Sequence, residues 1–239
     1  MVGSSLNEWN INPDPVTLAY HLKQWEEPYR STVHFADFLE HQLEGADHVV
    51  DLACGSGGPT WYLANRFPAT KFLGLDVSEE LIGHARRSRN LDFEIDDAEN
   101  LNVRFGVDGV VGMQMLHTMP DPGLPIHQIA TRLRPQWMAF STLIYEGNIN
   151  CKIVVSEPQR PRMSYYNIYG LPGLVYALGQ EGYQFSKYKK FNIDMDLPKP
   201  DNPDLMGTYT INTETSKLQC SGPLILPWGF VLFERRQYE

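Results

Sequence analysis

The most constraining feature of the sequence is a glycine-rich turn that directly follows a short apolar run. Residues 48–53 read HVVDLA, a run apolar enough for a buried strand, and the run contains Asp51 near its end. Three glycines occupy 55–58, and Pro59 is suited to the first turn of a helix. Because glycine has no side chain, a ligand can approach such a turn closely, although a tight turn alone has the same composition. The stretch predicts a strand, a turn and a helix.

Strands and helices alternate along the first 145 residues. Helical spacing runs through 15–44, where Pro28 is expected to separate two helices. Further helices are expected after Pro59, after Ser78 as a cap, and from Pro125. Strands are predicted at 71–76, 92–96, 107–116 and 137–144. This alternation predicts an α/β fold with a parallel sheet covered on both faces.

The last third of the chain has a different pattern. A helix is expected at 172–181 and a strand at 183–193, and the Pro- and Asp-rich segment that follows at 194–207 is expected to be a loop. β-prone pieces end the chain, at 208–215, 217–222 and 228–235. Turn residues separate them, so we expect antiparallel strands that extend the same sheet and add a hairpin.

The domain organisation follows from these patterns. A chain of 239 residues can bury one sizeable core. We expect a helical segment at 1–44 and one domain at 45–239, with insertions at about 145–170 and about 195–227. The first insertion is expected to be a long loop, and long ordered loops are often functional.

Composition narrows the classes of function. A formal net charge of -9 disfavours nucleic acid as a partner. The three cysteines are widely spaced, which disfavours a disulfide framework, and the histidines have no acids clustered beside them, so no metal site is expected. The N-terminus does not resemble a signal peptide, and no apolar run is long enough to span a membrane. We therefore expect a cytoplasmic protein.

Acidic residues end the next two predicted strands. Asp76 ends the strand at 71–76, where a carboxylate can accept hydrogen bonds from both hydroxyls of a ribose. Asp97 lies in the stretch DDAENL at the end of the third strand, within reach of an adenine amino group. The carboxyl ends of parallel strands share one edge of the sheet, where ligands bind. We expect these acids to lie beside the glycine-rich turn.

These motifs, in this order, are similar to those of class I S-adenosylmethionine-dependent methyltransferases. The resemblance covers about residues 45–145 and is carried by VVDLACGSGG, FLGLDVSEELI, IDDAENL, VDGVVGMQMLHTM and IATRLRP. It implies a seven-stranded, mostly parallel Rossmann-like sheet with an antiparallel last strand, an N-terminal helical lid and an added C-terminal β-hairpin. It also implies S-adenosylmethionine as the methyl donor and S-adenosylhomocysteine as the product.

The resemblance further implies a set of cofactor-binding residues. Asp51 and the turn would surround the methionine part, Asp76 would hold the ribose, and Asp97 would meet the adenine. Tyr29 or Arg30 would meet the carboxylate of the cofactor. The full set lies at the ends of four strands and in the lid: Asp51, Ala53, Gly55, Ser56, Gly57, Asp76, Val77, Asp97, Ala98, Gln114, Met115, Tyr29 and Arg30.

Two positions depart from the family pattern, and both bear on turn geometry. Ala53 stands where glycine is usual, and residues 135–137 read PQW where PGG is frequent. A nicotinamide-dependent oxidoreductase is the competing enzyme class, but its G-x-G-x-x-G pattern is incomplete in either register, because one begins on Ala53 and the other ends on Thr60. A non-catalytic module that binds the methyl donor is a further alternative.

His117 is the candidate catalytic base. Methyl transfer is an in-line displacement that needs the acceptor atom about 3 to 3.5 Å from the methyl carbon. A base is required only if the acceptor must lose a proton, as a hydroxyl does. His117 follows the predicted fourth strand, beside the expected position of the methyl group, and an imidazole titrates near neutrality. A purely structural histidine is an equally good interpretation.

The acceptor is expected to be a small polar molecule, such as a sugar, a nucleotide sugar or a secondary metabolite, methylated on oxygen or nitrogen. Candidate substrate residues offer hydroxyls, charges and stacking faces, and they come from the lid and the 145–170 insertion: Tyr20, Tyr145, Glu146, Arg160, Arg162, Tyr165 and Tyr166. A solvated charged loop would have a similar composition. The C-terminal hairpin either completes the sheet or forms a homodimer contact.

Overall fold

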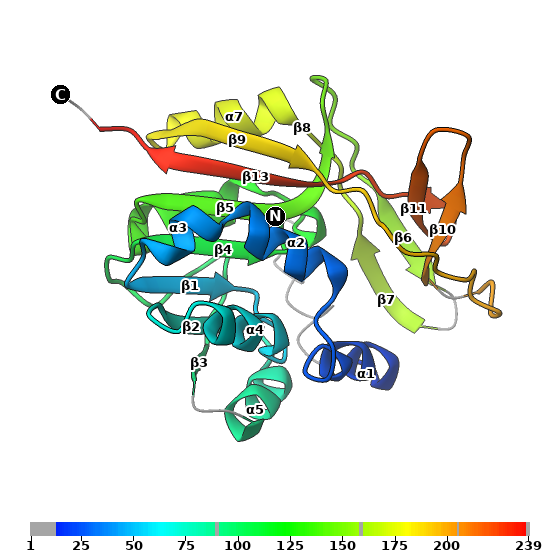
Figure 1. The fold of residues 1–239 in the computed structure, drawn as a ribbon, viewed down its shortest axis with the longest axis horizontal. Helices are drawn as coiled ribbons and strands as arrows, with labels where there is room; N and C mark the ends of the chain where they lie inside the picture. The colour runs from blue at the N-terminus through cyan, green and yellow to red at the C-terminus, as the bar shows by residue number, and fades with distance from the viewer. Residues whose placement is uncertain (1–12, 89–90, 158–159, 205, 238–239) are drawn as a thin grey trace, which may run out of the picture.

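A seven-strand path forms the centre of the molecule (Figure 1). The computed structural model describes residues 13–88, 91–157, 160–204 and 206–237, apart from the side chains of 88 and 160–163. The strand order is β3-β2-β1-β4-β5-β13-β9, and β8 (Tyr169–Gly170) pairs with the end of β5. The bounds are β1 His48–Leu52, β2 Lys71–Asp76, β3 Asp92–Ile95, β4 Gly109–Met113, β5 Trp137–Tyr145, β9 Tyr183–Lys190 and β13 Trp228–Arg235.

The pairing confirms the predicted sheet. The strands β1 to β5 pair in parallel, whereas β13 is antiparallel to both β5 and β9. Strand β2 has the predicted bounds, but β4 is shorter than predicted because the chain turns after Met113 into a 3-10 helix, η2 (Leu116–Thr118). The carboxyl ends of β1, β2 and β4 therefore lie next to one another, as a ligand site in such a sheet requires.

Helices cover both faces of the sheet. Their bounds are α1 Pro15–Lys23, α2 Arg30–Phe38, α3 Glu40–Glu44, α4 Gly58–Arg66, α5 Glu79–Ser88, α6 Gly123–Gln128, a π-helical turn Ile129–Leu133, and α7 Leu171–Gln180. Ser78 caps α5 as predicted, accepting a hydrogen bond from the Leu81 amide at 3.3 Å. Residues 15–44 form three helices instead of two, because Leu39 leaves helical geometry, and α6 begins at Gly123, before Pro125.

Two large apolar clusters pack on the two faces of the sheet. One contains Phe35 of α2, Leu63 of α4 and Phe230 of β13. The other contains Ile129 of the π-helical turn and Leu178 of α7. Because strand side chains alternate between faces, β5 contributes to both clusters and is buried except at Tyr145. No helix within the described ranges is long and apolar enough to cross a membrane.

Two accessory sheets lie beyond the carboxyl end of β1, at one end of the main sheet, and helix α1 lies at the same end (Figure 1). One is the antiparallel pair β6 (Val154–Glu157) and β7 (Arg160–Tyr165), so the prediction of a long loop at 145–170 was wrong. The side chain of Asn167 helps to fix this segment by accepting from the Ile153 amide at 3.0 Å and donating to the Met119 carbonyl at 2.8 Å. The other comprises β10 (Thr208–Asn212), β11 (Lys217–Ser221) and β12 (Leu224–Ile225).

Candidate functional site

Asp76 joins the end of β2 to the glycine-rich turn that follows β1. Its Oδ2 accepts a hydrogen bond from the Gly55 amide at 2.8 Å, and its Oδ1 accepts from the Ser78 amide at 2.9 Å. Asp76 is only 9% exposed. This burial raises the pKa of its carboxyl group, whereas the hydrogen bonds from the backbone lower that pKa. One side chain therefore fixes both the turn and the start of α5, and each carboxylate oxygen keeps a second acceptor position.

The turn itself uses left-handed backbone at three alternate positions. The φ angle is 59° at Ala53, 58° at Gly55 and 84° at Gly57. Ala53 therefore adopts the conformation that the usual glycine would adopt, at a cost of about 1 to 2 kcal/mol for a residue with a Cβ. Having alanine at position 53 in place of the usual glycine therefore does not change the left-handed geometry of the turn.

The space beside the glycines is occupied by the protein's own side chains. A Cβ added at Gly55 would lie 2.6 Å from Nδ1 of His21, and one at Gly58 would lie 2.9 Å from Cβ of Gln24. The turn also binds this N-terminal segment directly, because the Ser56 hydroxyl donates to the His21 carbonyl at 2.9 Å. The glycines thus let the segment around α1 approach the main chain, whereas the sequence predicted that they would admit a ligand.

The edge formed by the ends of β2 and β3 remains open. Val77 is 40% exposed and Ile95 is 46% exposed, and Ile95 pairs in register with Asp76. The two acids that follow β3 have different roles. Asp96 is buried and accepts hydrogen bonds from the backbone amides of Asp97, Asn102 and Val103, which shapes the loop, whereas Asp97 accepts from the Glu99 amide at 2.9 Å. Ala98 is buried beside it.

Asp51 is a buried carboxyl group at the end of β1. Its Oδ2 accepts a hydrogen bond from the Thr60 hydroxyl at 2.6 Å, and no described residue contacts Oδ1 by a hydrogen bond. Burial raises the pKa of Asp51 to about 7, against the effect of the Thr60 hydrogen bond, and the charge of Asp76 raises it further. A cationic group bound at Oδ1 would favour the ionised form.

The N-terminal segment is fastened over the end of β4 by a chain of polar contacts. Gln114, with a φ of 58°, accepts from the Tyr20 hydroxyl and donates to the Ser31 hydroxyl, both at 3.3 Å. The Tyr29 hydroxyl donates to the Tyr20 carbonyl at 3.0 Å. These contacts place Tyr20, Tyr29 and Gln114 together at one edge of the site.

Two predicted cofactor residues make contacts with other parts of the protein. Arg30 is paired with Asp194 in the segment after β9, with 3.1 Å between Nε and Oδ1, so its charge is already matched. Met115 is almost fully buried in the core cluster with Phe140. Arg30 is thus already paired and the side chain of Met115 lies in the core, and the roles of both residues in binding the cofactor stay predictions.

His117 lies in η2, just after β4, and is 5% exposed. Its ring stands edge-on to the ring of Trp228, with centroids 4.8 Å apart, and its Nδ1 has no hydrogen-bond partner among the described residues. Burial lowers the pKa of His117 to about 3. The imidazole is therefore neutral at physiological pH and is a much weaker base than a free histidine.

The predicted acceptor residues are only partly brought together. The Tyr166 ring lies 6.0 Å from the His117 ring, whereas Glu146 lies beside Tyr188 of β9 and Tyr145 is exposed. Tyr165 pairs with Val154 in the β6–β7 hairpin. The side chains of Arg160 and Arg162 lie outside the described part of the structure. Sequence analysis missed Trp228, whose only signal was an aromatic residue at the start of the last strand.

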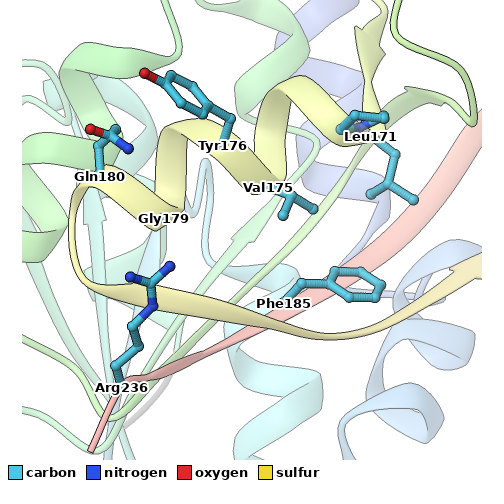
Figure 2. Close-up of a pocket in the computed structure, with 8 residues that line it drawn as sticks. Leu171, Val175, Tyr176, Gly179, Gln180, Phe185 and Arg236 are labelled. Atoms are coloured by element: carbon cyan, nitrogen blue, oxygen red, sulfur yellow. The ribbon is translucent and has the colours of Figure 1, made fainter. Parts of the chain in front are cut away.

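A surface groove occupies a different part of the molecule. Figure 2 shows this groove, of about 510 Å³, beside α7, with Val175, Phe185 and Arg236 among its lining residues. None of the predicted site residues lines it. The groove is thus separate from the strand ends at which the predicted site residues lie. Within the described ranges, no group of histidine, cysteine or acidic side chains is arranged to hold a metal ion.

The buried state of His117 predicts an acid-dependent loss of stability. Because its pKa is lowered to about 3 from 6.5, the unfolded state binds the proton first as the pH falls below 6.5. Protonation of His117 therefore does not oppose folding above pH 6.5, and we expect the free energy of unfolding to fall by about 1.4 kcal/mol per pH unit between pH 6 and pH 4. Urea unfolding of wild type and His117→Gln at pH 7 and pH 5 measures it. If the free energy of unfolding falls equally from pH 7 to pH 5 in wild type and in His117→Gln, the prediction is contradicted.

Comparison with known proteins agrees with this architecture. Residues 49–136 match the family described as "Methyltransferase domain". A Haloferax volcanii protein solved in complex with the Trm112 methyltransferase activator has a TM-score of 0.61 and 19% identity over 92% of this chain and 97% of its own. Magnesium protoporphyrin IX methyltransferase from Synechocystis, solved with bound SAM, has a TM-score of 0.53 and 13% identity over 94% of this chain and 86% of its own. These structural likenesses concern the fold.

Residues 49–136 therefore resemble a methyltransferase domain, and the sheet topology agrees with that likeness. Among named relatives, trans-aconitate 2-methyltransferase from Mycobacterium tuberculosis is 35% identical over 98 residues. That alignment covers 41% of this chain and 37% of the relative, so the chain spans less than half the length of this curated relative.

Proposed function

We propose that the chain transfers the methyl group of S-adenosylmethionine to a small-molecule acceptor. The observation that carries the proposal is Asp76, whose two hydrogen bonds fix the left-handed turn and the start of α5 beside the open edge formed by Val77 and Ile95. That edge offers acceptor oxygens for a ribose and apolar side chains for a base. The carboxylate of Asp76 and the exposed side chains of Val77 and Ile95 match the chemistry of a ribose and a base.

Each part of the cofactor has a proposed partner. Asp76 binds the ribose hydroxyls, Val77 and Ile95 contact the adenine, and Asp97 accepts from its amino group. Asp51 Oδ1, which is buried and unpartnered among the described residues, binds the cationic amino end of the methionine part. When bound, S-adenosylmethionine supplies an electrophilic methyl group for in-line displacement.

Residues 1–44 act as a lid in this proposal. The contacts of Ser56 with His21, and of Gln114 with Tyr20 and Ser31, fasten the described part of this segment over the ends of β1 and β4. A lid at this position excludes water from the site and restricts access to the donor. The single domain at 45–239 with two insertions remains part of the same proposal.

The acceptor is proposed to be a small molecule methylated on oxygen or nitrogen. The name of the relatives, trans-aconitate 2-methyltransferase, supports a small acceptor, and a hydroxyl or amine of a sugar or metabolite remains our hypothesis. With a pKa of about 3, His117 is better suited to orient an acceptor by a hydrogen bond than to remove its proton. A homodimer through the C-terminal hairpin also remains a hypothesis.

Methyl transfer is tested with S-adenosylmethionine labelled in its methyl group. We expect label to appear in at least one member of a panel of hydroxyl, amine and carboxylate metabolites, with equal formation of S-adenosylhomocysteine. If the donor binds but no label moves to any acceptor, the non-catalytic alternative replaces the proposal. Binding of a nicotinamide cofactor in place of the donor would favour an oxidoreductase.

A further inference from the structure

Three buried polar side chains gather on the sheet face that α2 covers. They are His117, Ser141 on β5 and Trp228 at the start of β13, with exposures of 5%, 2% and 7%. Their Nδ1, Oγ and Nε1 atoms are buried and have no hydrogen-bond partner among the described residues. We refer to these three residues as the polar cluster.

The register of the strands and one ring contact place the members of the polar cluster on one face of the sheet. Trp228 is opposite Leu143 in the β5–β13 pair, two residues along β5 from Ser141, so the side chains of Trp228 and Ser141 are on the same face. The rings of Trp228 and His117 have centroids 4.8 Å apart. Tyr166, at 6.0 Å from His117, adds a further ring, so the polar cluster is bordered by aromatic side chains.

Such an arrangement is costly for the protein alone. A buried polar group without a partner destabilises a protein, because it has lost its hydrogen bonds to water without replacing them. Three of them on one face at the carboxyl end of the sheet, two of them in ring contact, are therefore an exception that a bound ligand would explain. The polar cluster lies just after β4, beside Gln114 and its hydrogen bond with Tyr20, where we expect the acceptor of the proposed reaction to bind.

The polar cluster also restricts the charge of that ligand. No charged side chain of a described residue contributes to the pKa shift of His117, which burial alone produces. On the α2 side, the charges of Arg30 and Asp194 are paired with each other. None of the described side chains therefore supplies a cation to His117, and a carboxylate bound among these residues would be desolvated without a described partner. The indole Nε1 of Trp228 is a donor only, so the group that it binds must be an acceptor.

We propose that Trp228, together with His117 and Ser141, sets the specificity for an uncharged aromatic acceptor that carries a hydroxyl or carbonyl oxygen. The oxygen accepts from Trp228 Nε1, and the polar atoms of His117 and Ser141 bind the neighbouring part of the acceptor. The inference rests on the proposed methyl transfer and narrows its substrate. It sets this chain apart from relatives named for trans-aconitate, which is a tricarboxylate.

The test compares phenol with benzoate, two planar probes that differ in charge at pH 7. Each is titrated to millimolar concentration into the ¹⁵N-labelled full chain saturated with S-adenosylhomocysteine, and the indole ¹H–¹⁵N signals are followed by NMR. Trp228→Phe identifies the Trp228 signal, and Trp25→Phe serves as a matched assignment control. If Trp228→Phe does not fold, the other four Trp→Phe variants assign the signal by elimination.

We expect phenol to shift the Trp228 indole signal in a saturable manner and benzoate to shift it at least tenfold less at equal concentration. An equal or larger effect of benzoate, or no effect of either probe, would overturn the inference. A calorimetric titration of the unmodified chain with S-adenosylhomocysteine is run in parallel. If S-adenosylhomocysteine does not bind in the calorimetric titration, the proposed function is rejected. The phenol and benzoate titrations are then repeated without S-adenosylhomocysteine, so that the polar cluster is tested separately.

Discussion

In an Asp76→Ala variant, we expect the affinity for S-adenosylhomocysteine to fall at least 100-fold. The change removes the acceptors of the Gly55 and Ser78 amides and leaves both donors buried. It also removes the proposed partner of the ribose hydroxyls. A loss of 100-fold corresponds to about 2.7 kcal/mol, which hydrogen bonds to one charged group, at about 1.5 to 3 kcal/mol each, readily supply. Isothermal titration calorimetry measures the affinity.

Asp92→Ala is the matched control for this experiment. Asp92 begins β3, at the opposite end of the same strand pair, and is exposed. Its removal should change the affinity less than threefold. If Asp76→Ala binds as well as Asp92→Ala, while thermal unfolding shows both to be folded, Asp76 is a structural residue and the cofactor site lies elsewhere.

Gly57→Ala should destabilise the fold by about 2 to 4 kcal/mol, through backbone strain and overpacking together. Gly57 has a φ of 84°, and a Cβ at this position would lie 2.6 Å from the ring of Phe93 and 3.1 Å from Cβ of Ala85. Neither neighbour can move freely, because both are buried in a small apolar cluster. Urea unfolding monitored by tryptophan fluorescence gives the change in free energy.

Gly83→Ala provides the comparison of opposite sign. Gly83 lies within α5, and nothing occupies the 4 Å around an added Cβ. The same chemical change should there stabilise the protein by up to about 1 kcal/mol, because alanine favours the helix. A Gly57→Ala variant as stable as wild type would show that the turn tolerates a side chain and that its left-handed geometry is not required.

The fold from β1 to β5 was predictable because its signals are local. The apolar runs that became β1, β2 and β5 lie between strong turn and cap residues, and Ser78 caps α5 as expected. The 145–170 segment was mispredicted because Asn167, which fixes it, bonds to Met119, 48 positions away. No local pattern reports such a contact.

The candidate site was predictable in part for the same reason. Asp51 and Asp76 followed from strand ends, and the structure places both beside the turn. The role of Arg30 was not predictable, because its partner Asp194 is 164 positions away. The packing of the N-terminal segment against the glycines was also not predictable, since the approach of His21 to Gly55 is a tertiary contact. Trp228 becomes a candidate only when β13 is seen to pair with β5.

The central claim is that the edge formed by Asp76, Val77 and Ile95 receives an adenosine. Calorimetric titration with S-adenosylhomocysteine and, separately, with NAD tests it most directly on the unmodified chain. The account predicts one site for S-adenosylhomocysteine with a micromolar or lower dissociation constant and no heat from NAD. Silence toward S-adenosylhomocysteine, or saturable binding of NAD alone, would contradict it.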